Sequence, residues 1–216
     1  MIDLKQFLKS YWEYFLELEE QFVETKRFVA FDSHNYDAYS IEYLKLYQAV
    51  CSEIDVVGKE IAVAVNPGFK IDNKTNIQKW GYEVQQKFPQ LKDAIVVFND
   101  SEKCHPFKNW EYEQYTSIDK NGVLRTNLRI KGNKKAIQWW SSYNKIKHRR
   151  IGLVEGTKNF HLANQGNLVQ AFSALFLLER LYIESFQHYT CEAIIESRLF
   201  DIHKNSEYMK IQNGIS

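Results

Sequence analysis

The chain has 216 residues, 44% of them hydrophobic and 25% charged, which is the composition of an ordinary globular protein. Lysine and arginine total 28 against 27 aspartate and glutamate, and a net charge of +1 argues at first against a dedicated nucleic-acid binder. Its apolar runs, such as residues 61–65 and 94–98, are far shorter than the roughly 18 residues that span a bilayer. We expect a single domain over residues 1–216 and no membrane partner.

The cellular compartment is predicted from the N-terminus and the cysteines. Asp3 and aromatic residues at helical spacing stand where a signal peptide has a basic stretch followed by an apolar core. The three cysteines, Cys51, Cys104 and Cys191, are widely separated and odd in number, which suits reduced thiols. We therefore expect a cytoplasmic protein.

The first part of the chain is predicted to be helical. Apolar residues recur at three- and four-residue steps over residues 3–28, the pattern of a long amphipathic helix. A second long helix is predicted over residues 36–65, where Asn-Pro-Gly ends it, and a shorter one over residues 74–88, which Pro89 ends. Helices of this length favour a bundle.

The pattern then changes to that of strands. Two stretches rich in β-forming residues flank residues 119–122, whose Asn-Gly pair is a strong hairpin signal, and we predict a small β insertion over residues 93–131. Helical spacing resumes at Asn133 and breaks at Gly152, and a last long helix is predicted over residues 162–189. The tail after Ser197 is expected to add a turn of helix. The predicted fold class is mainly α: an up-and-down helical bundle with a β-hairpin insertion.

Charge is distributed unevenly along the chain. Residues 1–60 contain twelve acids and six bases, whereas residues 120–150 contain ten bases and no acid. A positive block on a hairpin that leads into a helix can follow a phosphate backbone, even when the net charge of the chain is near zero. The alternative is a solvated basic face without a ligand.

The helix predicted around residues 137–148 carries the chemistry. Trp140, Asn144 and His148 are spaced by four and share one face, while Trp139, Tyr143 and Lys147 occupy the next strip. Imidazole can act as acid or base near neutral pH, and guanidinium binds phosphate. These are the groups that RNA transesterification needs. The alternatives are a histidine satisfied by the helix C-terminus and, for the tryptophans, core packing, which is favoured over base stacking.

This helix resembles the signature helix of the HEPN superfamily, a group of all-α proteins. The family motif is arginine, a polar residue, three variable residues and histidine. In the frame YNKIKH, Asn144 takes the polar position and His148 the histidine, while Tyr143 stands in place of the arginine. The form Asn-x-x-x-His-x-Arg is similar to uncharacterised and abortive-infection (AbiU2-like) branches, and the resemblance covers about residues 1–195.

The resemblance implies a metal-independent endoribonuclease that acts on RNA and leaves a 2′,3′-cyclic phosphate, in phage defence or a toxin–antitoxin setting, with no cofactor. It also implies a homodimer, because HEPN sites form where two motif helices meet. The implied catalytic residues are His148, Asn144, Arg149 and Tyr143, and the implied RNA-phosphate ligands are Lys145, Lys147, Arg150, Lys134 and Lys135. The alternative, suggested by Tyr143, is a non-catalytic module that binds RNA or a protein partner such as an antitoxin or a defence-system protein.

Three supporting residues are predicted in the sequence SEIDVVGKE of residues 52–60. Glu53, Asp55 and Lys59 are candidates to face the motif helix, where the acids would orient His148 or the bases; the alternative is a solvated stripe. The sequence has no Gly-rich phosphate loop, no G-x-S-x-G elbow and no His or Cys ligand set. Nucleotide hydrolysis, serine hydrolase chemistry and a metal site are therefore not expected.

Overall fold

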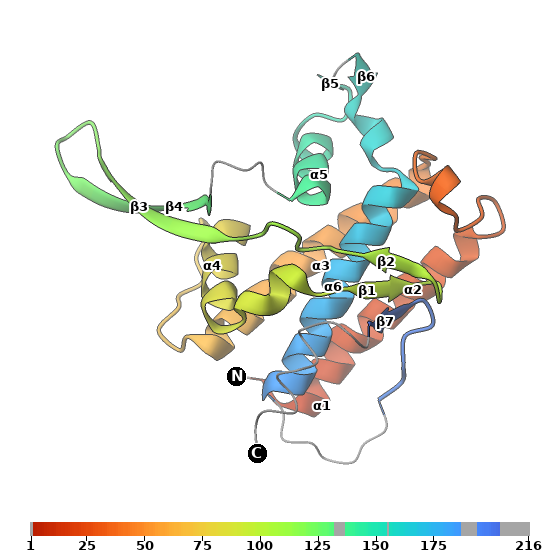
Figure 1. Cartoon of the computed structure of the whole chain (residues 1–216), viewed down its shortest axis with the longest axis horizontal. Coiled ribbons are helices and arrows are strands. Elements are labelled where there is room, and N and C mark those ends of the chain that lie inside the picture. The colour runs from red at the N-terminus through yellow and green to blue at the C-terminus, as the bar shows by residue number, and fades with distance from the viewer. Residues whose placement is uncertain (1, 132–136, 155, 187–193, 204–216) are drawn as a thin grey trace.

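The computed structural model describes residues 2–131, 137–154, 156–186 and 194–203, and it is mainly helical, as predicted (Figure 1). Helix α1 (Leu4–Phe7), a π-helical turn (Leu8–Trp12) and α2 (Glu13–Thr25) follow one another without a break. Together they form the first predicted long helix. The π turn adds a residue to the helical repeat, which shifts the buried face between α1 and α2.

The central helix is α3 (Ile41–Val65), which contacts α2, α4 (Ile77–Lys87), α5 (Gln138–His148) and α6 (Gln165–Phe186). It begins later than predicted because the Ser40 side chain caps it, accepting a hydrogen bond from the backbone N–H of Tyr43. The N-cap of α4 is Asn76, and a 3₁₀ turn that begins with Pro89 follows this helix, as the proline indicates.

The core lies where α3 and α6 pack against the first helix. Phe22 stacks on Phe172 with ring centroids 5.1 Å apart, and Phe7 stacks on Tyr182 with centroids 4.1 Å apart. The high aromatic content therefore serves the packing of this core. The predicted start of a helix at Asn133 and the predicted end of the last helix at residue 189 lie outside the described residues.

A small sheet joins distant parts of the chain. Strand β1 (Val96–Phe98) pairs antiparallel with β2 (Glu102–Cys104) on one side and with β7 (Phe200–Ile202) on the other. The prediction of a helical turn after Ser197 is therefore wrong at β7. Phe200 and Ile202 are buried on either side of the exposed Asp201, and this alternation is stabilised by pairing with β1 rather than by local propensity.

The predicted hairpin is confirmed as β3 (Tyr112–Ile118) and β4 (Leu124–Ile130), which pair antiparallel around the turn at residues 119–122. Gly122 has φ +76°, the conformation that this turn needs. The hairpin extends away from the helices in Figure 1. A second, short hairpin, β5 (Leu153–Val154) and β6 (Thr157–Lys158), follows α5 and leads through a 3₁₀ turn at Asn159–Leu162 to α6. No helix in the described part of the chain is both long enough and apolar enough to cross a membrane.

Candidate functional site

Helix α5 is fixed to the core by one face and by both ends. Trp139, Tyr143 and Ile146 are buried, and the Trp139 indole N–H donates to the carbonyl of Pro106 over 2.8 Å. At the other end, the buried Asn159 side chain donates to the carbonyl of Arg149 over 2.7 Å, which caps the helix C-terminus. The opposite face of α5 is therefore held in a defined position.

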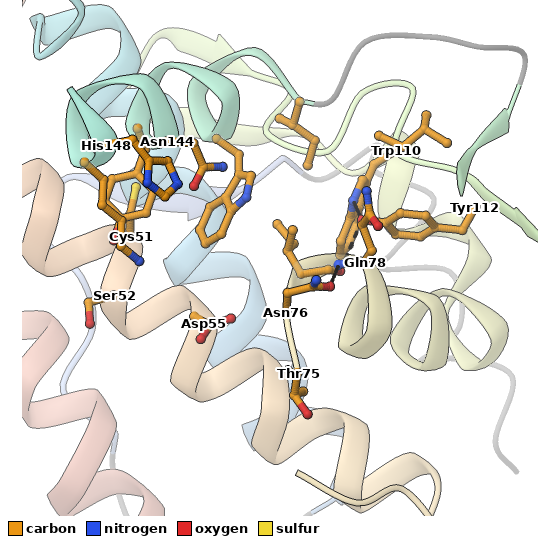
Figure 2. Close-up of a pocket in the computed structure, with 16 residues that line it drawn as sticks. Cys51, Ser52, Asp55, Thr75, Asn76, Gln78, Trp110, Tyr112, Asn144 and His148 are labelled. Carbon is orange, nitrogen blue, oxygen red and sulfur yellow. Dashed lines mark hydrogen bonds between the residues drawn. The ribbon is translucent and has the colours of Figure 1, made fainter. Parts of the chain in front are cut away.

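A cleft of about 500 Å³ opens on that face, between α3, α4, α5 and the base of the β3–β4 hairpin. Figure 2 shows His148 and Asn144 on the α5 side, Asn76, Gln78, Trp110 and Tyr112 on the other side, and Asp55 on α3 between them. Ser52, also on α3, lines the cleft near His148. The remaining lining residues are Cys51, Thr75, Ile77, Ile130, Ile137, Trp140, Tyr143 and Lys147.

The histidine and the asparagine of the motif lie together in this cleft. His148 is the last residue of α5 and is exposed, and Asn144, one turn earlier, is half-buried. Neither side chain has a hydrogen-bond partner among the described residues. Lys147 also lines the cleft. An imidazole, an amide and an ammonium group are thus available to a ligand at one end of the cleft.

Tyr143, at the position of the family's arginine, is a core residue. It is 6% exposed, its ring lies edge-on to that of Tyr47 with centroids 6.2 Å apart, and the Lys147 ammonium lies 5.5 Å from its ring centroid. Burial raises the pKa of the Tyr143 phenol, and Cys51 and Asp55 add to the rise. At the position where the motif has a charged arginine, this chain therefore has an aromatic ring that makes a cation–π contact with the Lys147 ammonium.

Of the three predicted supporting residues, Asp55 alone lines the cleft. One of its carboxylate oxygens accepts from the Trp80 indole N–H over 2.9 Å, and the other accepts from Lys59 Nζ over 2.5 Å. No hydrogen bond joins Asp55 to His148 in the described part of the chain. Glu53 and Lys59, the other two predicted supporting residues, do not line the cleft.

The basic stretch is partly neutralised by acids from just outside it. On the hairpin, Arg125 pairs with Asp119 over 2.5 Å and Arg129 pairs with Glu113 over 2.7 Å. Lys131 lies 3.6 Å from Glu111. The hairpin therefore does not carry the unbroken positive charge that the count of bases in residues 120–150 predicted, because antiparallel pairing places acids of β3 and the turn beside bases of β4.

Free positive charge is instead concentrated at the C-terminus of α5. Lys145, Lys147, Arg149 and Arg150 are exposed and have no ion pair among the described residues. Cations are stabilised at this end of a helix by its dipole. The two arginines flank the cleft without lining it, and Arg150 reaches Gln48 over 3.4 Å. The predicted ligands Lys134 and Lys135 lie outside the described residues.

The far side of the cleft was missed by sequence reasoning. Gln78 and Asn76 come from the start of α4, and Trp110 and Tyr112 from the segment that enters β3. Nothing in the sequence relates them to His148, because a contact between segments so far apart is decided by how α4 packs on α3. The one local signal in the sequence is Asn76, because asparagine is a common residue at the N-cap of a helix.

The described residues contain no group of three or more His, Cys, Asp or Glu side chains placed to hold a metal ion. Comparisons with protein-family models, with curated proteins and with solved structures find no significant match to this chain. The resemblance to the HEPN superfamily therefore depends on the α5 motif and on the order of the surrounding elements.

Proposed function

We propose that this protein is a HEPN-like, metal-independent endoribonuclease that acts on RNA in the cytoplasm, in phage defence or a toxin–antitoxin setting. The observation that carries the proposal is the cleft in which His148, Asn144 and Lys147 lie together, beside the unpaired cations at the end of α5. The resemblance adds a HEPN-type bundle and a homodimer in which two motif helices meet. No cofactor takes part in the proposed reaction.

In the proposed reaction His148 takes the proton of an RNA 2′-hydroxyl, and the oxygen attacks the adjacent phosphorus. The bond from phosphorus to the 5′ oxygen breaks, and His148 returns the proton to that oxygen. The products are a 2′,3′-cyclic phosphate and a 5′-hydroxyl. Asn144 positions the imidazole or the phosphate, and Lys147 with Arg149 and Arg150 offsets the charge that develops on the phosphate oxygens.

The test is cleavage of RNA by purified protein in EDTA at high enzyme concentration. We expect the wild type to release fragments ending in a cyclic phosphate and His148→Ala to be at least about 100-fold slower. His34→Ala is the matched control, because His34 is an exposed histidine paired with Asp32 and does not line the cleft. Identical RNA profiles for wild type and His148→Ala would show that the protein is not this nuclease.

The second candidate function is a non-catalytic module that binds RNA, or a protein partner such as an antitoxin, through the same basic surface. The buried Tyr143 favours it, because this chain has a tyrosine at the motif position of the arginine that HEPN nucleases use together with the histidine. This candidate predicts RNA binding without cleavage. The slope of log affinity against log salt should become shallower by about 0.7 for each RNA phosphate that a variant no longer neutralises.

Two variants separate the unpaired cations from the paired ones. Arg149→Ala/Arg150→Ala removes exposed cations without an ion pair among the described residues, and it should weaken binding and reduce the salt dependence. Arg125→Ala is the control, since Arg125 is already paired with Asp119 and should contribute less. If the two changes weaken RNA binding equally, the C-terminal end of α5 is not the binding surface.

A further inference from the structure

The wall of the cleft opposite His148 carries an unused amide. Gln78 lies in the first turn of α4, and its side chain is exposed with no hydrogen-bond partner among the described residues. The backbone N–H of Gln78 donates to Asn76 Oδ1 over 3.0 Å. The N-cap therefore fixes the start of α4, and with it the position of Gln78, while the Gln78 amide group itself stays available to a ligand.

Aromatic rings also line the cleft. Trp140 on α5 is half-buried, and its ring centroid lies 5.2 Å from that of the buried Tyr143. On the far side, the Trp110 indole N–H donates to the hydroxyl of Tyr112 over 2.7 Å, and that hydroxyl donates to the carbonyl of Ile77. The polar side-chain atoms of Trp110 and Tyr112 are thus satisfied within the protein, whereas Trp140 offers a ring to a flat ligand.

The charges of the cleft narrow the choice of ligand. Among the described residues that line it, the only carboxylate is that of Asp55, and both of its oxygens are engaged, by Trp80 and Lys59. The ammonium group of Lys147 and the imidazole of His148 lie on α5, and Figure 2 shows His148 across the cleft from Gln78. Arginine and lysine suit guanine, carboxylates suit cytosine, and an amide, which donates and accepts side by side, suits adenine.

We infer that the cleft binds an adenine base of single-stranded RNA, stacked on Trp140 and read at its edge by Gln78. This inference rests on the proposed function, because it needs RNA in the cleft with a phosphate near His148. The volume of about 500 Å³ suffices for a nucleotide. Gln78 is a specificity-determining residue in this arrangement and takes no part in the chemistry.

The experiment measures binding with cleavage blocked. The probes are short fluorescein-labelled oligouridines with one central adenine, cytosine, guanine or uracil, and 2′-fluoro groups in place of every 2′-hydroxyl. We expect wild type to bind the adenine probe about tenfold more tightly than the uracil probe. Gln78→Ala should reduce this preference to within about twofold, and Trp140→Ala should weaken binding of all probes about tenfold.

Two further variants complete the design. Gln86→Ala is the matched control, since Gln86 is an exposed glutamine on the same helix that does not line the cleft, and it should keep the wild-type preference. Gln78→Glu keeps the shape of the side chain and replaces its donor by an acceptor, so it should lose the adenine preference and favour cytosine. Unfolding curves that match the wild type establish that each variant is folded.

The outcomes separate this inference from the proposed function. If wild type binds the probes without a preference for adenine, or if Gln78→Ala retains the preference, the inference is overturned while the proposed nuclease stands. If no probe binds and RNA is not cleaved, both are overturned. If the preference for adenine disappears in Gln78→Ala and persists in Gln86→Ala, the inference is supported, whether or not the protein cleaves RNA.

Discussion

The indole N–H of Trp80 donates to the carboxylate of Asp55, and this bond ties α4 to α3 beside the cleft. Trp80 is fully buried, whereas the Asp55 side chain is 29% exposed and also holds Lys59. Asp55, which the sequence suggests as a partner for His148, is thus engaged by Trp80 of α4, on the far side of the cleft.

Loss of the Asp55 carboxylate should destabilise the fold. Asp55→Ala leaves the buried Trp80 N–H without an acceptor and should lower the free energy of unfolding by about 1–3 kcal/mol, whereas Asp55→Asn retains an acceptor and should cost less than about 1 kcal/mol. Urea unfolding measures both, with Val56→Ala as an exposed control on the same helix. If Asp55→Asn changes the pH profile of RNA cleavage without changing stability, Asp55 acts on His148 instead.

Gly58 should not tolerate a side chain. A Cβ atom at this position would lie 2.6 Å from the ring of Trp80, so Gly58→Ala should destabilise the protein by about 1–3 kcal/mol through overpacking. In an open helical site the same change would stabilise by about 1 kcal/mol. Thermal or urea unfolding gives the sign directly, and a stabilised Gly58→Ala would mean that α4 does not pack closely on α3.

Glu179 should make stability depend on pH. The carboxyl of Glu179 on α6 is fully buried and has no hydrogen-bond partner in the described part of the chain; burial, and then Glu53, raise its pKa well above the ordinary value of 4.5. The neutral form is favoured in the folded state. Stability from this group is therefore complete below its unfolded pKa and is lost as pH rises toward its folded pKa, by up to about 1.4 kcal/mol per pH unit.

The variant Glu179→Gln removes this titration. We expect its urea midpoint to exceed that of the wild type at about pH 9 and the difference to shrink at about pH 5, since the wild-type carboxyl is then protonated. The groups that act on the same region are Glu53 and Tyr11, which are left unchanged. A constant difference between the two proteins across this range would show that Glu179 does not titrate there.

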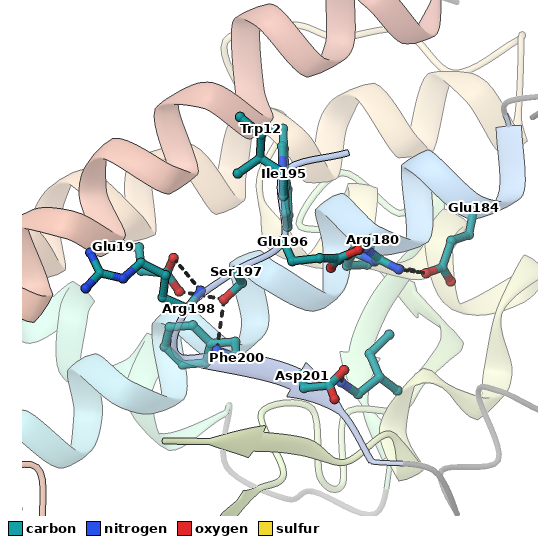
Figure 3. A network of polar contacts seen from close by, with 11 residues as sticks. Trp12, Glu19, Arg180, Glu184, Ile195, Glu196, Ser197, Arg198, Phe200 and Asp201 are labelled. Carbon is teal, nitrogen blue, oxygen red and sulfur yellow. Dashed lines mark hydrogen bonds and ion pairs between the residues drawn. The ribbon is translucent and has the colours of Figure 1, made fainter. Parts of the chain in front are cut away.

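Glu19 should hold the C-terminal strand in place. Its carboxylate, 1% exposed on α2, accepts hydrogen bonds from the Ser197 hydroxyl over 2.5 Å and from the backbone N–H of Arg198 over 3.0 Å (Figure 3). It also accepts a hydrogen bond from the backbone N–H of Leu199 over 3.0 Å. Glu19→Ala would leave these donors unpaired at a cost of about 1–3 kcal/mol for each one that stays buried.

Hydrogen–deuterium exchange measures this effect locally. We expect Glu19→Ala to speed exchange across residues 197–203, because β7 is attached to the helices through Glu19 and to the sheet through β1. Glu20→Ala is the control: Glu20 pairs with the Arg198 side chain at the surface, and exposed pairs contribute at most about 1 kcal/mol. Equal exchange in the two variants would contradict a special role for Glu19.

The sequence alone determined the helices, the β3–β4 hairpin and the face that His148, Asn144 and Trp140 share. These follow from periodicity, caps and turn residues, which act over a few positions along the chain. The sequence alone also showed that basic residues are concentrated in residues 120–150. The net charge of +1 does conceal a basic region, but the bases of the hairpin are neutralised by neighbours that a count along the chain does not pair with them.

Only the tertiary structure decided which residues face His148, that Asp55 is engaged by Trp80, and that residues 200–202 form a strand. Each depends on contacts between segments distant in sequence: α4 on α3, and β7 beside β1. A three-residue segment has little preference of its own, so the edge of β1 and the carboxylate of Glu19 determine its conformation. Local patterns cannot encode such contacts, because packing free energy outweighs local propensity wherever side chains are buried.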